Sequence, residues 1–138
     1  ASFEKSEPEQ TKPKNEESID SLLDEINIFA TNIKTLFVAT NTFGPQLTNA
    51  FCAKSGALPS SVTKQGSQLI NTNGYAINVA GHDSHFTITY TGLSAKTCAQ
   101  LLANYHKVDF LYNAITTHNE TCEGSCENKS CKITFFGK

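Results

Sequence analysis

Apolar side chains recur every three or four residues over residues 18–40, and this period predicts an amphipathic helix. Ser18 is suited to cap its start, and the Gly- and Pro-containing segment 41–45 ends it. Ile28 and Val38 fall outside the apolar stripe, so the outer face of the helix is not wholly polar. The stripe consists of Ile19, Leu22, Leu23, Ile26, Phe29, Ile33, Leu36 and Phe37.

The apolar period changes from about four to two after residue 68. A short helix over 47–53 and a polar loop over 56–68 are predicted before this change. Residues 74–79 and 85–90 then alternate on either side of a Gly- and Asp-containing turn, which predicts an antiparallel β-hairpin.

A second amphipathic segment follows the hairpin. Ser94 is suited to cap a helix over 95–105, with Cys98, Leu101 and Leu102 on one face. Strands are predicted over 108–116 and 132–136, with a polar loop that holds three cysteines between them. One helix packed on a meander of strands, with a cross-linked C-terminal region, gives an α+β fold.

Residues 1–17 differ in composition from the rest of the chain. They combine alternating Glu and Lys with two prolines and one bulky apolar side chain, Phe3. Such a segment cannot bury enough surface to offset the entropy of ordering it, so we expect a flexible tether or a truncation remnant, and an expression tag would look similar. Residues 18–138 then form a single domain.

Charge and composition exclude several classes of function. The 138 residues carry a net charge of −2, which gives no broad electrostatic attraction to nucleic acid or to an anionic membrane. Lysines and glutamates share the region near the C-terminus, so we expect a solvated loop of mixed charge there and no nucleic-acid partner. No stretch reaches the roughly 18 to 20 apolar residues that span a membrane. The chain does not begin with Met, which indicates a processed or trimmed start.

Five cysteines in so short a chain favour an oxidising compartment and disulfide bonds. The spacing of Cys122, Cys126 and Cys131 lacks the paired Cys-x2-Cys knuckles of zinc sites, and no His lies at the expected offset. An odd number leaves one thiol free or bonded to another chain.

The segment His82-Asp83-Ser84-His85 is the one candidate for metal or hydrolytic chemistry. We interpret it as a polar hairpin turn, because its side chains diverge and no third ligand is placed by the sequence. His106 and His118 are interpreted as solvated loop residues. We therefore expect no catalytic residues, no metal, no cofactor and no enzymatic activity.

Several short phrases of the sequence carry a family resemblance. They are Leu47-Thr48-Asn49, Gly56-Ala57-Leu58-Pro59, Phe86-Thr87-Ile88-Thr89-Tyr90, Leu93-Ser94-Ala95-Lys96-Thr97-Cys98-Ala99-Gln100-Leu101 and Ile133-Thr134-Phe135. In this order, after a helix that ends at a Gly-bearing break, they resemble the type IVb pilins, especially the short subunits of thin conjugative and attachment pili. The resemblance covers roughly residues 18–138, and its most specific part runs from residue 86 to residue 101.

The resemblance implies a layout for the domain. Helix 18–40 corresponds to the second half of a pilin spine, 41–73 to the αβ-loop, and 74–138 to the sheet with the D-region. The disulfide that closes the D-region maps onto Cys98 and Cys126, which leaves Cys122 and Cys131 to form a second bridge and Cys52 free. Two features depart from the family: Pro8 and Pro13 would interrupt a continuous spine helix, and short pilins often have only one cysteine pair.

The function that the resemblance implies is that of a structural subunit of a bacterial type IVb pilus, used for attachment, aggregation or conjugation. Its partners would be other pilin subunits, the inner membrane through an N-terminal hydrophobic helix that precedes this sequence, and a receptor on a host or recipient cell. The subunit would reside in an extracellular pilus after an inner-membrane precursor stage. The helical stripe with Ile28 would form the assembly helix, and Ile28 and Val38 would face neighbouring subunits.

Two alternatives remain at the level of the sequence. A minor pilin or pseudopilin that primes or tips a pilus, secretion or DNA-uptake machine would have the same fold. A secreted cysteine-rich binding domain would instead use the two Asn-x-Ser/Thr sequons at Asn119 and Asn128, which are chance matches in a bacterial pilin.

Overall fold

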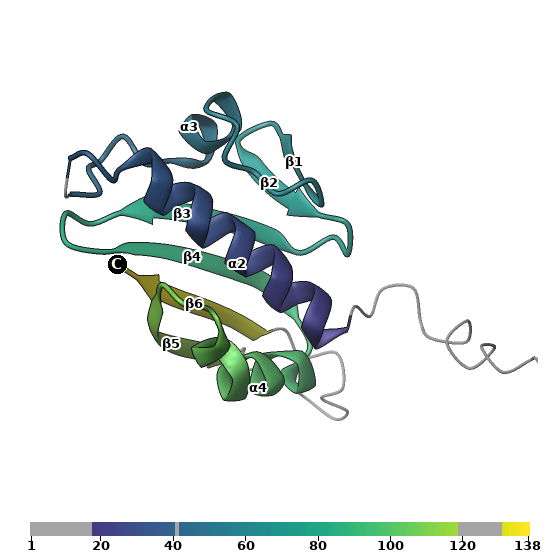
Figure 1. Cartoon of the computed structure of the whole chain (residues 1–138). Helices are drawn as coiled ribbons and strands as arrows, with labels where there is room; N and C mark the ends of the chain where they lie inside the picture. The colour runs from purple at the N-terminus through teal and green to yellow at the C-terminus, as the bar shows by residue number, and fades with distance from the viewer. Residues whose placement is uncertain (1–17, 41, 119–130) are drawn as a thin grey trace, which may run out of the picture.

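The computed structural model describes residues 18–40, 42–118 and 131–138 (Figure 1). The predicted tether over 1–17 and most of the predicted cysteine-bearing loop, 119–130, lie outside the described residues. The first described helix, α2, spans Ile19–Leu36, and the Ser18 hydroxyl accepts a hydrogen bond from the Ser21 amide as predicted. The helix ends four residues earlier than predicted. Its C-cap, Phe37, is buried, and the Phe37 ring packs against those of Phe43 and Phe51 at centroid distances of 5.6 and 5.9 Å.

The segment after α2 contains more regular structure than the sequence predicts. Helix α3 spans Asn49–Lys54 and is capped by Thr48, close to the predicted range. The expected polar loop over 56–68 is wrong in its second half, because strands β1 (Val62–Gln65) and β2 (Gln68–Asn71) form a hairpin there. The turn contains Gly66, whose φ of 66° suits a residue without a side chain.

The remaining elements follow the predicted order. They are β3 (Ala76–Gly81), β4 (Phe86–Leu93), α4 (Ala95–Asn104), a short 3-10 helix η1 (Tyr105–Lys107), β5 (Leu111–His118) and β6 (Cys131–Gly137). The hairpin β3–β4 is antiparallel as predicted, and Ser94 caps α4. The predicted inward face of α4 needs one correction: Cys98 and Leu101 are buried, whereas Leu102 is 40% exposed.

The six strands of the described residues form one antiparallel sheet in the order β1-β2-β3-β4-β6-β5. The last strand lies between β4 and β5, so the sheet is not the simple meander that the sequence suggests. Helix α2 crosses one face of the sheet (Figure 1). Between them lies the core, whose largest fully buried side chains include Phe29, Tyr90 and Phe135. The fold is therefore α+β, with one principal helix packed on an antiparallel sheet.

Candidate functional site

Helix α2 has one face in the core and one face that is accessible. Of the predicted assembly residues, Leu22, Leu23, Ile26, Phe29, Ile33 and Phe37 are buried within the domain, and Ile19 and Leu36 pack partly against the same core. The six buried side chains hold the domain together and do not reach its surface. Ile28 is different, because its side chain is 47% exposed. Val38, which lies just beyond the helix, is 67% exposed. The predicted assembly residues therefore divide into a stripe that packs in the core, which we call the core stripe, and one accessible residue, Ile28.

The accessible side of α2, which we call the outer face, changes character along its length. It consists of Asp20, Asp24, Asn27, Ile28, Thr31, Thr35 and Val38. Asp20 lies in the first turn, where negative charge interacts favourably with the helix dipole, and Asp24 lies one turn later. From Asn27 onward the outer face carries no charged residue. The half-buried Lys34 borders this half of the outer face, with its Nζ 5.6 Å from the centre of the Phe110 ring. A partner that covers only the uncharged residues named above removes no charge from water.

Glu25 lies on the buried side of α2 and is 3% exposed. Its carboxylate accepts hydrogen bonds from Ser61 Oγ at 2.6 Å, from Asn71 Nδ2 at 3.1 Å and from the Tyr90 hydroxyl. These donors come from the approach to β1, from β2 and from β4. The sequence does contain a signal for this position, since Glu25 lies three residues after Leu22 and four before Phe29, on the apolar stripe. The network links the buried side of α2 to three other segments of the fold.

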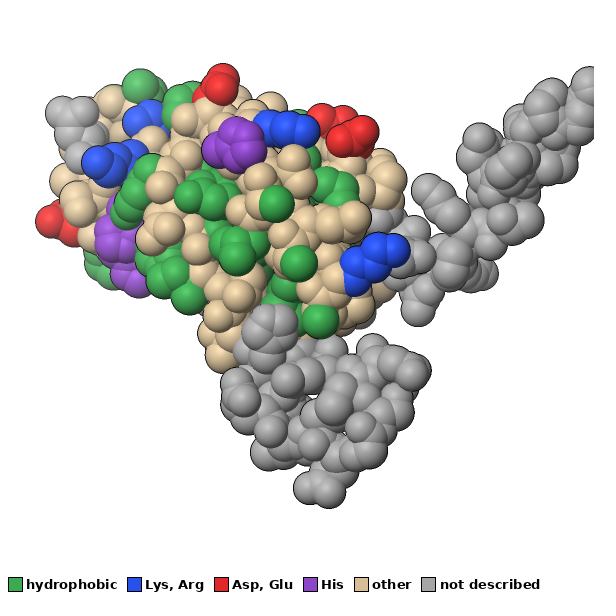
Figure 2. Space-filling model, turned by 90° about the horizontal axis from the view of Figure 1, so that it is seen from below, with side chains coloured by type: hydrophobic (Ala, Val, Ile, Leu, Met, Phe, Trp, Pro, Cys, Tyr) green, Lys and Arg blue, Asp and Glu red, His purple; other side chains and the backbone are tan. Residues whose placement is uncertain are grey.

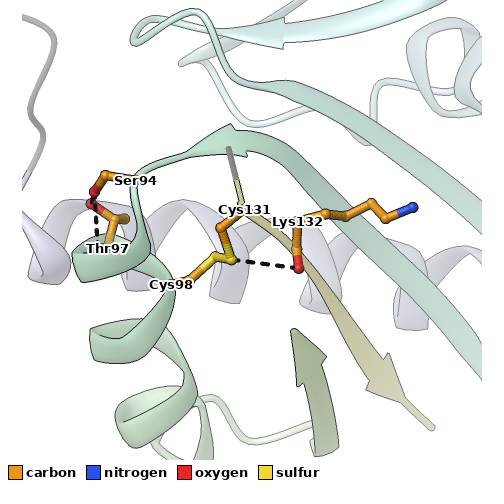
Figure 3. Close-up of a disulfide and its surroundings, with 5 residues drawn as sticks. All are labelled: Ser94, Thr97, Cys98, Cys131 and Lys132. Carbon is orange, nitrogen blue, oxygen red and sulfur yellow. Dashed lines mark hydrogen bonds between the residues drawn. A yellow bond between two sulfur atoms is a disulfide. The ribbon is translucent and has the colours of Figure 1, made fainter. Parts of the chain in front are cut away.

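The disulfide bond joins Cys98 of α4 to Cys131 at the start of β6, with the two Cα atoms 6.4 Å apart (Figure 3). The predicted pairs Cys98–Cys126 and Cys122–Cys131 are therefore wrong. The reason is the register of the sheet: Cys131 lies opposite Leu93, the last residue of β4, and α4 begins directly after the Ser94 cap. Strand pairing thus brings Cys131 to the first turns of α4. Cys122 and Cys126 lie outside the described residues.

The bridge closes the part of the chain that contains β5 and residues 119–130. Figure 3 shows the two cysteines between α4 and β6, beside the Ser94 cap, whose hydroxyl accepts a hydrogen bond from the Thr97 amide at 3.1 Å. The resemblance to pilins implied a closed C-terminal loop anchored at Cys98, and the structure retains that anchor with a different partner.

Cys52 is the free thiol that the sequence left over, and it is fully buried. Burial raises its pKa to about 12, because the charged thiolate would lose its hydration. A thiol with such a pKa is almost entirely protonated at neutral pH, and the thiolate is the nucleophilic form. Cys52 is therefore a core residue in this fold and is not poised to bond another chain.

We expect Cys52 to resist alkylation by iodoacetamide at pH 8 in the native protein and to react fully after denaturation in urea. Mass spectrometry of peptides from each sample measures the labelled fraction at this cysteine. The unfolded chain serves as the internal control for reagent and time. Labelling of the native protein at the same rate as the denatured chain would contradict the burial of this side chain.

The His82–His85 turn contacts both the sheet and the segment that follows α2. The two imidazole rings stack with centroids 4.7 Å apart, and His82 Nε2 lies 3.1 Å from Thr87 Oγ1. Asp83, at a φ of 71°, exchanges two backbone hydrogen bonds with Phe43. Within residues 18–40, 42–118 and 131–138, no group of three or more His, Cys, Asp or Glu side chains is arranged to hold a metal ion. His106 lies in η1 on the surface.

A shallow pocket of about 200 Å³ lies between the start of α2 and η1. Its lining includes Asp20, Asp24 and Lys107, all of them on the surface. No helix in the described part of the chain is both long enough and apolar enough to cross a membrane.

Comparison with models of protein families matches residues 16–134 to the family described as PilS N terminal. No curated protein and no solved structure matches the chain in parallel comparisons. The matched region begins just before the Ser18 cap and ends within β6, so it includes α2, the disulfide and nearly all of the sheet. The chain belongs to the PilS N-terminal family, a pilin-related family.

Proposed function

We propose that this protein is a structural subunit of a bacterial type IVb pilus that acts by polymerising into surface filaments. The observation that carries the proposal is the family match over residues 16–134. The fold supports it, since a helix that buries one face on a sheet and leaves the other accessible suits a subunit that packs around a common helical core. The partners are other copies of the subunit, and the site of action is an extracellular pilus used for attachment, aggregation or conjugation.

The mechanism in this proposal is non-covalent association, without catalysis. The uncharged second half of the outer face, with Ile28, Thr31, Thr35 and Val38, contacts neighbouring subunits. Burying exposed apolar side chains releases about 25 cal/mol per Å² of area removed from water. The core stripe of α2 takes no part in this contact, because it is already occupied by the sheet.

We expect replacement of both Ile28 and Val38 by serine to reduce filament formation severely, with little change in the stability of the isolated domain. Surface substitutions away from buried groups usually change the free energy of unfolding by no more than about 0.5 kcal/mol. Filaments sheared from cells and quantified by immunoblot give the first measurement, and urea unfolding of the purified domain gives the second.

The matched control for this prediction is Ile33→Ser, since Ile33 is a fully buried aliphatic side chain on the opposite face of α2. That variant should destabilise the domain itself by roughly 2 to 5 kcal/mol. If the Ile28 and Val38 variant unfolds the isolated domain, or assembles filaments at the wild-type level, the assignment of the outer face is wrong. A subunit that is scarce in sheared filaments would favour a minor-pilin role.

A further inference from the structure

Strand β5 forms one edge of the sheet. Along one side it pairs with β6, from Leu111 opposite Gly137 to His118 opposite Cys131. No strand in the described part of the chain pairs with its other side. Alternate N–H and C=O groups along that side point away from the sheet, as in any edge strand, and can accept a further strand.

The composition of β5 gives this edge little protection against pairing, and the irregularity in its register with β6 lies between Leu111 and Asn113, near the start of the strand. Its sequence, Leu-Tyr-Asn-Ala-Ile-Thr-Thr-His, contains no Lys, Arg, Asp, Glu or Pro. Natural edge strands are usually shortened, charged or interrupted by proline to prevent association. The opposite edge follows that rule, because β1 has only four residues and presents an exposed Lys64. The two edges of the sheet therefore differ, and β5 is the one open to pairing.

The surface beside β5 is also suited to being covered. Of the five exposed large hydrophobic residues in the described chain, two lie on β5 and one on α4: Tyr112 at 47%, Ile115 at 51% and Leu102 at 40%. Figure 2, viewed from below, shows hydrophobic and uncharged side chains over the middle of this face, with the charged and His side chains toward its rim. Two lysines border this surface, since Lys138 Nζ lies 5.1 Å from the centre of the Tyr112 ring and Lys132 lies opposite Thr117 on β6. A partner centred on Ile115 lies between them.

We propose that two copies of this chain associate by antiparallel pairing of β5 with β5, which joins their sheets into one continuous sheet. In an antiparallel pair, two residues that lie opposite each other point to the same face of the sheet. The two-fold axis that relates two β5 strands must therefore place one residue of β5 opposite its own copy. Asn113, Ile115 and Thr117 are exposed, while Ala114 between them is buried. An axis at Ile115 sets Ile115 against its own copy and Asn113 against Thr117, and no charge opposes a like charge.

A second copy is the occupant that fits this edge, for two reasons. Specific binding of a strand from another protein would require complementary charges or pockets along the edge. β5 carries no charged residue that could provide such complementarity. An uncharged strand that can pair with itself instead satisfies the requirement of an isologous two-fold contact. This association does not depend on the proposed filament, since it uses β5 and leaves the outer face of α2 free.

Analytical ultracentrifugation of the purified chain over a wide range of concentrations tests the proposal. We expect a concentration-dependent monomer–dimer equilibrium, and Ile115→Lys should raise the dissociation constant at least about tenfold by setting two like charges against each other. Thr63→Lys places the same charge on an exposed position of β1, at the opposite edge of the sheet, and should leave the equilibrium unchanged. Thermal unfolding of both variants checks that the domain remains folded.

Hydrogen exchange supplies a second readout. The outward amides of β5 should exchange more slowly in concentrated than in dilute samples, while those of β1 should not change. A monomer at every concentration overturns the proposal. A dimer that withstands Ile115→Lys, or that is lost equally with Thr63→Lys, also overturns it and would point to association through another surface. Filament assembly in cells is measured separately, so failure of either proposal leaves the other intact.

Discussion

Replacing both Cys98 and Cys131 by alanine is expected to lower the free energy of unfolding by about 3 to 4 kcal/mol. The bridge joins residues that are 33 positions apart, and without it the unfolded chain gains the entropy of an open loop of that length. Both cysteines are buried, so the variant also loses packing between α4 and β6. Urea unfolding followed by circular dichroism measures the change in midpoint, and for a small domain such a loss is a large part of the total stability.

The control for this prediction is a Cys122→Ser, Cys126→Ser variant, which retains the Cys98–Cys131 bond. Adding reductant should lower the free energy of unfolding of this variant toward that of the Cys98→Ala, Cys131→Ala variant. Reductant should not change the stability of the variant that lacks Cys98 and Cys131. An alanine pair as stable as the parent chain would show that the bond does not constrain the domain. Peptide mapping of the unreduced protein provides the direct test of the connectivity.

Replacing Glu25 by alanine is expected to cost about 3 kcal/mol or more. The variant removes the acceptor that the Tyr90 hydroxyl, the Asn71 amide and the Ser61 hydroxyl share, and each buried donor that loses its partner costs about 1 to 3 kcal/mol. Because these donors come from three different segments, α2 also loses a link to each of them. Urea unfolding of the purified domain measures the loss.

Two neighbouring variants make the Glu25 result specific. Asp24→Ala removes an exposed carboxylate from the adjacent position and should change the free energy of unfolding by no more than about 0.5 kcal/mol. Glu25→Gln keeps the shape but sets an NH2 group against donors, so its loss should lie between those of the two alanine variants. Equal stability of the Glu25 and Asp24 alanine variants would show that the buried network contributes nothing.

The elements that the sequence predicted correctly are those with strong local signals. Ser18 and Ser94 stand directly before amphipathic runs and cap α2 and α4, and alternation over 85–90 identifies most of β4. The β1–β2 hairpin was missed because β1 buries only Val62, with exposed polar residues after it, so its alternation is too weak to read. The place of β6 between β4 and β5 was missed for another reason, since strand order depends on pairings between residues far apart in the chain.

The residues of the candidate site also divide into those with a local sequence signal and those that depend on distant contacts. The periodicity of α2 alone indicated that Ile28 and Val38 lie off the apolar stripe, and both are exposed in the fold. Periodicity could not show that the other residues of the predicted assembly helix pack against the domain's own sheet. Nor could it reveal the poorly protected edge of β5, which exists only because β6 inserts beside it.

The sequence by itself determined that the chain has an amphipathic helix with an imperfectly polar outer face, strands after residue 68 and a cysteine anchor at Cys98. Tertiary structure alone decided the partner of Cys98 and the role of Glu25. Each of these depends on atoms that distant segments bring together: β4–β6 register carries Cys131 to α4, and packing of α2 on the sheet delivers three donors to one carboxylate. The spacing of residues along the chain does not predict these contacts, because they depend on how the strands pair.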